Sequence, residues 1–152
     1  MRISAKVDYA VRALCELAAH PGDAPVKAEE IARAQEIPLS FLENILVDLR
    51  RAGFVRSLRG QVGGYRMATP ASEITVADVI RAVEGPLADV RGVRPESLTF
   101  HGSATALRDV WLATRVGLRR VLEGVTIADI VAGDIPRDVR ALLDDPDALV
   151  PH

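Results

Sequence analysis

The residues from 56 to 70, RSLRGQVGGYRMATP, concentrate positive charge and turn-forming residues in one short stretch. They include three arginines and three glycines, and the wider span from Leu49 to Ser72 carries five arginines and no acidic residue. Clustered guanidinium groups bind phosphate, so the stretch could be a nucleotide-phosphate loop, a disordered basic linker or a hairpin that meets a polyanion. A nucleotide-phosphate loop ends in Gly-Lys-Ser/Thr, whereas this one ends in Gly-Gly-Tyr, which disfavours the first alternative.

The charge of the chain is unevenly distributed. Its formal net charge is −2, but residues 1–72 carry ten basic and eight acidic side chains, whereas residues 73–152 carry nine and thirteen. Local potential rather than net charge governs an encounter with nucleic acid, so the negative total does not exclude DNA as a partner. Because 17 of the 19 basic residues are arginines, their abundance carries no signal and only their clustering does.

Composition predicts a globular cytoplasmic protein of one domain with an attached element. The 152 residues are 49% apolar and 26% charged, which is typical of a chain with a hydrophobic core. No apolar run approaches the ~20 residues that span a bilayer, and the first residues lack a secretory pattern, so no membrane is expected as a partner. The single cysteine, Cys15, excludes an internal disulfide and is interpreted as an inert core thiol.

Two helices and a turn are predicted before the arginine-rich stretch. Apolar residues spaced three and four apart indicate a helix over 4–20, and a shorter helix is expected over 28–36. Ile37-Pro38 then forces a turn, because the residue before a proline is pushed out of the helical region.

The next helix has its own start signal. Ser40 and Glu43 have the spacing of a capping box, and an apolar stripe continues up to Gly53. Two strands, 54–58 and 64–68, follow and are joined by a glycine-rich turn. A short helix, a tight turn, a capped helix and a hairpin, in this order, are the elements of a winged helix-turn-helix.

The second half of the chain is predicted to be helical around one long loop. Thr75 and Asp78 form a second capping box for a helix that Gly85-Pro86 ends, and residues 85–103 are irregular. A helix over about 104–124 carries positions four and three residues apart, the spacing of a coiled-coil seam. The seam residues, predicted to mediate dimerisation, are Leu107, Trp111, Thr114, Leu118 and Val121.

The predicted DNA contacts lie on the second helix of the pair, which enters the major groove, and on the hairpin. Asn44 can pair with an adenine edge, and Glu43 can accept a hydrogen bond from a cytosine amino group. Arg59, at the tip of the hairpin, can enter a narrow minor groove, and the hairpin glycines allow close approach to phosphates. The predicted DNA-binding residues are Ser40, Phe41, Glu43, Asn44, Arg50, Arg51, Arg56, Arg59, Gln61 and Arg66.

Simpler roles compete with several of these assignments. Ser40 and Glu43 could serve only as a helix cap, and Phe41 either meets a thymine methyl group or covers the helix end. Trp111 is interpreted as a packing residue of the seam, and His101 as a surface-loop residue.

Two other classes of function compete with a DNA-binding regulator. A winged-helix protein–protein module that does not bind DNA is the alternative; exposed apolar residues on the second helix favour it and the acid-free arginine span does not. An enzyme is not expected, because the sequence offers no acid–base pair, no nucleophile with its base and no metal-ligand spacing.

Four motifs carry a family resemblance over residues 1 to about 131. They are DYAVRALCELA (8–18), IPLSFLENILVDLRRAGFVRSLRGQVGGYRMA (37–68), ITVADVIRAVEGP (74–86) and VLEGVTIADI (121–130). With these motifs the chain resembles the bacterial winged-helix regulators typified by IscR, NsrR and CymR, the Rrf-two family. The resemblance implies a homodimeric transcriptional regulator, most commonly a repressor of a roughly palindromic operator. It also implies that the helix starting at Ser40 reads the major groove and Arg59 the minor groove.

One departure from that family concerns its sensor. The iron–sulfur members carry three cysteines between the counterpart of Gly85-Pro86 and the long helix, whereas residues 87–104 contain none here. Thiolates hold such clusters, so the resemblance implies a member without a cluster or other cofactor. Such a member responds to a small-molecule or protein effector or to a thiol change, and the loop 85–103 is the candidate site of that input.

The predicted fold class is mainly α with a small β-hairpin wing. Thr126 and Asp129 form a further capping box for a short helix, and a last helix is expected over 136–144. The predicted segments are a DNA-binding domain (1–84) with its helix-turn-helix (28–52) and wing (54–68), a candidate sensor loop (85–103), a dimerisation helix (104–125) and short helices with a tail (126–152).

Overall fold

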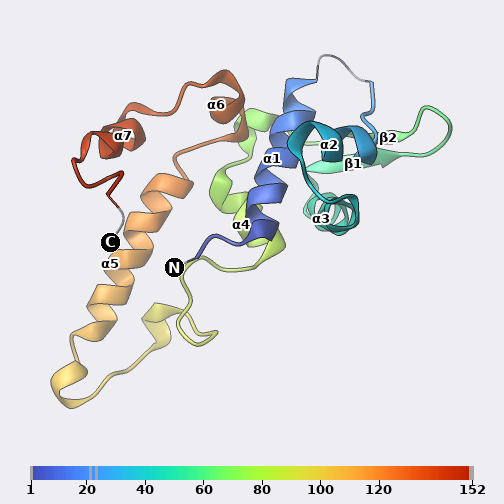
Figure 1. The fold of residues 1–152 in the computed structure, drawn as a ribbon. Coiled ribbons are helices and arrows are strands. Elements are labelled where there is room, and N and C mark those ends of the chain that lie inside the picture. Colours follow the sequence, from blue (N-terminus) through green and yellow to red (C-terminus); the bar gives the residue numbers. More distant parts are fainter. Residues whose placement is uncertain (1, 21, 23, 151–152) are drawn as a thin grey trace.

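The computed structural model describes residues 2–150 other than 21 and 23, and it confirms a mainly helical chain with one hairpin (Figure 1). Among these described residues no helix has the length and apolar content that a bilayer crossing requires. The helices are α1 (Ala5–Ala19), α2 (Ala28–Gln35), α3 (Leu39–Arg51), α4 (Val76–Val83), α5 (Leu107–Leu122), α6 (Ile127–Ala132) and α7 (Arg137–Arg140), and the strands are β1 (Val55–Leu58) and β2 (Gly64–Met67).

One hydrophobic core joins α1 to α4 with the hairpin. The predicted apolar stripes face it: Leu14 of α1, Ile31 of α2 and Leu46 of α3 are fully buried. Burying an aliphatic side chain of this size stabilises a fold by about 1.5–3 kcal/mol. The core therefore fixes α3 against α1 and α2 and leaves the opposite face of α3 exposed.

The turn between α2 and α3 corrects one prediction. Glu36 adopts the left-handed backbone conformation, with φ 52°, and Pro38 becomes the N-cap of α3. The helix therefore begins at Leu39 and places Ser40 inside its first turn, where its hydroxyl caps nothing. The predicted capping box of Ser40 and Glu43 is wrong, because the proline turn starts the helix before Ser40 is reached.

The hairpin is anchored to the body by a third segment. β1 and β2 pair antiparallel with Arg56 opposite Arg66, and Val26 adds one residue to the sheet through two hydrogen bonds with Tyr65, of 2.7 and 2.8 Å. A Cβ atom at Gly64 would lie 2.4 Å from the carbonyl oxygen of Val26. This glycine is therefore required by the protein's own backbone, a role different from the predicted approach to phosphate.

Both downstream capping boxes are present as predicted. The hydroxyl of Thr75 accepts a hydrogen bond from the amide of Asp78, and that of Thr126 accepts one from the amide of Asp129, each at 3.1 Å. Thr75 and Thr126 also face each other in an isolated β-bridge. This bridge returns the chain to the core, where Ile127 is fully buried.

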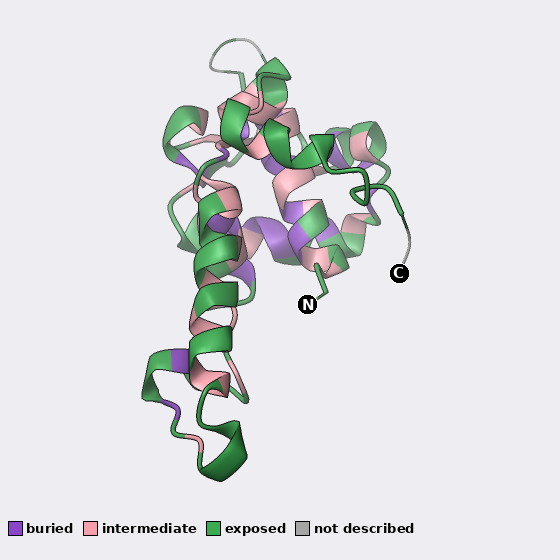
Figure 2. Cartoon of the chain, turned by 90° about the vertical axis from the view of Figure 1, so that its left-hand side faces the viewer, coloured by how far each residue is buried: buried purple, intermediate pink, exposed green. Residues whose placement is uncertain are grey.

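Helix α5 differs from α1 to α4 and α6 because none of its residues is fully buried. It starts later than predicted, since residues 102–104 form a 3-10 turn instead of its first turn. Figure 2 shows it as an arm of exposed and half-buried residues that extends from the body beside the loop that follows α4.

Candidate nucleic-acid interface

The outer face of α3 carries a mixed set of polar, charged and aromatic side chains. Its exposed members are Ser40, Phe41, Glu43, Asn44, Arg50 and Arg51. The amide of Asn44 donates a 3.0 Å hydrogen bond to the carbonyl of Ser40 on the same helix, at the surface, where a base edge could replace it. The residues predicted to read bases thus share one accessible face.

Phe41 packs against its own chain at the start of α3 and also remains largely exposed. Its ring packs edge-on against Tyr9 of α1, with centroids 6.4 Å apart, and still leaves 58% of the residue exposed. The guanidinium of Arg12 lies 5.6 Å from the centroid of the Tyr9 ring. Tyr9 supports the start of α3 from a distant helix, which no local sequence signal could indicate.

The two arginines at the end of α3 point in different directions. Arg50 donates a 3.3 Å hydrogen bond to the hydroxyl of Ser57 on β1 and so ties the helix to the hairpin. Arg51 lies 3.5 Å from Asp48, whose other oxygen is 2.8 Å from the ammonium of Lys6. Asp48 therefore positions Arg51, which remains highly exposed.

The start of α3 presents backbone donors. No side chain caps it, because the N-cap residue is Pro38. The first amides of a helix lack an intrahelical partner, and with the helix dipole they attract anions. This feature was not predicted, since the sequence placed a capping serine there.

The hairpin carries its arginines toward solvent with one exception. Arg56, Arg59 and Gln61 are exposed, whereas Arg66 is partly buried and has an interaction within the protein. Val62, at the tip, is 81% exposed, and sequence reasoning gave it no role. Hence Arg56 and the tip are the accessible part of the predicted wing contacts.

The structure brings α3 and the hairpin together and leaves the predicted dimerisation residues apart from them. The hairpin projects beside α3 (Figure 1), and the bond from Arg50 to Ser57 joins the two elements. Thr114 of α5 is exposed, while the other four seam residues are half-buried against their own chain.

The residues present do not fit an iron–sulfur cluster. Cys15, the one cysteine of the chain, lies half-buried on α1 and packs against the core, where burial raises the pKa of its thiol. Clusters are held by several thiolates, and low thiol pKa values favour metal binding. Within the described part of the chain, no group of three or more His, Cys, Asp or Glu side chains could hold a metal ion.

Comparison with known proteins identifies the class. The family model described as "Rrf2: Iron-dependent Transcriptional regulator" matches residues 3–133. The candidate HTH-type transcriptional regulator Rv1287 of Mycobacterium tuberculosis is 48% identical over 145 residues, covering 95% of this chain and 90% of the relative. The HTH-type transcriptional regulator CymR of Bacillus subtilis is 33% identical over 132 residues, covering 87% and 91%.

Solved structures agree with this result. The structure of CymR, the global cysteine regulator of B. subtilis, matches with a TM-score of 0.74 at 31% identity, covering 88% of this chain and 98% of that one. The structure of T. potens IscR matches with a TM-score of 0.69 at 32% identity, covering 100% and 93%. The expectation of a regulator rather than an enzyme is confirmed, and the chain belongs to the Rrf2 family of transcriptional regulators.

Proposed function

We propose that the chain is a homodimeric, sequence-specific DNA-binding repressor that acts in the cytoplasm. In this proposal α3 enters the major groove and the hairpin tip enters the neighbouring minor groove. The observation that carries it is the joined surface of α3 and the hairpin, where exposed arginines and polar side chains occur in a span with no acidic residue from Leu49 to Ser72.

Each part of that surface has a distinct task. Asn44, Glu43 and Phe41 meet base edges, because amide, carboxylate and aromatic groups match adenine, cytosine and thymine in the major groove. Arg59 inserts into the minor groove, where a narrow A·T tract concentrates negative potential. Arg56 contacts phosphate and supplies affinity that falls with salt.

The uncapped start of α3 supports the same orientation. Its free amides at Leu39 and Ser40 belong to the turn from which Phe41 projects, and a backbone phosphate satisfies such donors. A phosphate at this position fixes the helix in register while the side chains read bases.

Dimerisation follows from the exposure of α5. An isolated helix of this length is marginal in water, and no residue of α5 is fully buried against its own chain. Packing of two copies along the seam that contains Thr114 covers the exposed part of α5. Two-fold symmetry then places the two copies of α3 about 34–36 Å apart, or a multiple of that, on a palindromic site.

We further propose that regulation takes place without an iron–sulfur cluster, as the poor fit of the available ligands supports. Iron and sulfide analysis of protein purified without oxygen tests this point. Neither element is expected in stoichiometric amount, and stoichiometric amounts of both would contradict it.

Selection from a random DNA pool tests DNA recognition and identifies the operator in the same experiment. Purified protein should enrich a palindromic sequence, and that sequence placed in a promoter should reduce transcription when the protein is added. Retention of no DNA sequence above background, with the protein folded, would overturn the proposal in favour of the protein–protein module.

A further inference from the structure

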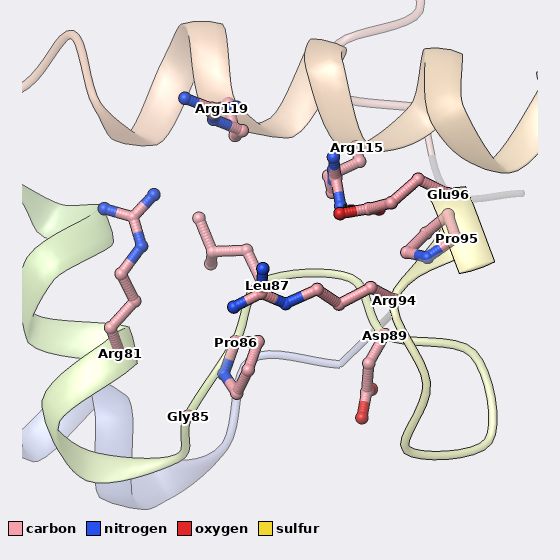
Figure 3. A pocket seen from close by; sticks show the side chains of 10 residues that line it. All are labelled: Arg81, Gly85, Pro86, Leu87, Asp89, Arg94, Pro95, Glu96, Arg115 and Arg119. Carbon is pink, nitrogen blue, oxygen red and sulfur yellow. Dashed lines mark hydrogen bonds and ion pairs between the residues drawn. The ribbon is translucent and has the colours of Figure 1, made fainter.

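A pocket lies between α4, the loop that follows it and α5, away from the surface proposed for DNA (Figure 3). Its volume is about 580 Å³, which is within the usual range for small-molecule sites. The walls combine apolar groups with charged side chains. The lining includes Arg81, Leu87, Asp89, Arg94, Glu96 and Arg115.

Four guanidinium groups reach this pocket from three segments. Arg81 comes from α4, Arg94 from the loop, and Arg115 and Arg119 from α5. Two lining residues are acidic, so the lining itself has a surplus of positive charge. Guanidinium groups bind carboxylate and phosphate oxygens in bidentate geometry, and four of them facing one cavity is an arrangement that suits a multivalent anion.

The arginines differ in how far the protein itself satisfies them. Arg81 is paired with Asp78 and with Glu123, which also pairs with Arg119. Arg115 is paired with Glu96. Glu123 holds two arginines at once, which leaves most of their N–H donors unused.

Arg94 is the exception. Within the described residues its guanidinium makes no hydrogen bond and no ion pair, and Figure 3 shows its side chain running from the loop into the pocket. Its charge interacts through space with that of Glu96, and the neighbouring residue Pro95, which is buried, holds this part of the loop at the cavity.

We propose that this pocket binds a small organic anion with at least two negative charges, either carboxylates or phosphates. Its charged groups pair with Arg94, Arg115 and Arg119, and its carbon skeleton packs on the apolar wall formed by Pro86 and Leu87. The pocket is a ligand site of this chain's own residues and needs no metal.

The position of the pocket allows a bound ligand to influence the proposed DNA-binding surface. Arg81 belongs to α4, which packs against α3, while Arg115 and Arg119 belong to α5. A bound anion joins the loop that follows α4 to α5 and so favours one placement of the proposed dimerisation helix relative to α4 and the recognition helix packed on it. This last step rests on the proposed function, whereas the binding site itself does not.

Titration calorimetry on the full chain tests the site directly. Citrate and pyrophosphate serve as the carboxylate and phosphate probes, and acetate at equal ionic strength serves as the monovalent control. At least one of the two probes should bind with saturable heat and acetate should not. Absence of saturable binding by both citrate and pyrophosphate would overturn the proposal.

Variants locate the binding within the pocket. Arg94→Gln should weaken the bound probe by about tenfold or more, since it removes charge-assisted hydrogen bonds without breaking a contact of the protein. Arg91→Gln, an exposed arginine of the same loop outside the pocket, is the matched control and should change affinity by less than about twofold. Asp89→Asn should tighten binding, because it removes a negative charge from the lining. Equal effects of Arg94→Gln and Arg91→Gln would overturn the proposal.

Operator affinity measured with and without the bound probe separates this inference from the proposed function. A probe that binds the pocket and shifts DNA affinity supports both. Saturable binding in a protein that recognises no DNA sequence would leave the anion site standing and refute the proposed function. DNA recognition by a protein that binds neither probe would leave the proposed function standing and refute the anion site.

Discussion

Residues 5–83 and helix α5 differ in how far their helices are buried within the chain. The first region buries its apolar stripes within one chain, with Leu14, Ile31 and Leu46 fully inaccessible, whereas α5 is of similar length to α1 and buries none of its side chains. The first region can therefore hold α3 and the hairpin rigidly in a single copy. α5 leaves every residue at least partly exposed, and we propose that a second copy covers it.

This contrast predicts that different substitutions change DNA affinity and folding stability. Substitutions of the exposed side chains of α3 or of the hairpin should alter DNA binding and leave folding largely unchanged, since those side chains contribute little to the core. Substitutions at Thr114, the exposed residue of the α5 seam, should alter assembly first and DNA binding as a consequence.

The largest effect is expected from Thr114→Asp. Thr114 is exposed in the single chain, so the added carboxylate harms only a packed seam, where two copies would bring like charges together. Dissociation into monomers should lower operator affinity on the order of 100-fold, because each copy then reads one half-site. Sedimentation and fluorescence anisotropy measure the two changes. Val116→Asp, on the other side of α5, is the control and should remain dimeric, and a dimeric Thr114→Asp protein would refute the seam.

The next largest effect concerns base readout. Asn44→Ala and Arg59→Ala should each weaken binding to the selected site by about 1–3 kcal/mol, while binding to a shuffled duplex changes little. Competition between the two duplexes at fixed salt gives the ratio of the two affinities. Equal losses on both duplexes would show that these residues contact only the backbone, and Arg137→Ala on α7 controls for charge removed elsewhere.

A smaller effect is expected from Arg56→Gln. This exposed residue is proposed to contact phosphate, so its loss should reduce the slope of log affinity against log salt by about one and affect both duplexes alike. Anisotropy titrations at several salt concentrations measure the slope. An unchanged slope would remove Arg56 from the interface.

The smallest effect is expected on folding stability, at the start of α6, where the chain returns to the core. The hydrogen bond from the Thr126 hydroxyl, followed by that from its backbone amide, lowers the pKa of Asp129. A carboxyl with a lowered pKa stabilises the fold above its unfolded-state pKa, and that stabilisation is lost as pH falls through the folded-state pKa. Asp129→Asn should therefore lower Tm at neutral pH, and the difference from the unsubstituted protein should shrink in acid. Equal Tm differences at neutral and at acid pH would contradict this role of Asp129.

Local signals in the sequence predicted most elements of the fold, because they act over a few residues. The capping boxes at Thr75 and Thr126 and the strands around Gly64 are of this kind, and all are present. The start of α3 was missed because it depends on Glu36 entering the left-handed region, which a turn packed on the core stabilises and a local pattern does not reveal.

The site was predictable in composition and less so in geometry. The arginine cluster is visible in the sequence, but the sequence could not show that Arg50 turns toward Ser57 or that Arg66 is partly buried. The loop 85–103 was predicted as the candidate sensor region, but its arginine-lined pocket was not, since Arg81 and Arg115 are 34 residues apart in the chain and meet only in the folded structure.

The central claim is that the surfaces of α3 and the hairpin from two copies together read one operator. Affinity cleavage tests it most directly. An iron chelate that cleaves nearby deoxyribose is attached at Val62→Cys, at the hairpin tip, in a Cys15→Ser background, and Leu143→Cys, far from the hairpin in the sequence, is the control. The account predicts cuts at two positions placed symmetrically about the centre of the selected site, in the minor groove, and none with the control. Cleavage that is absent or evenly spread, while the labelled protein still protects the site, would contradict it.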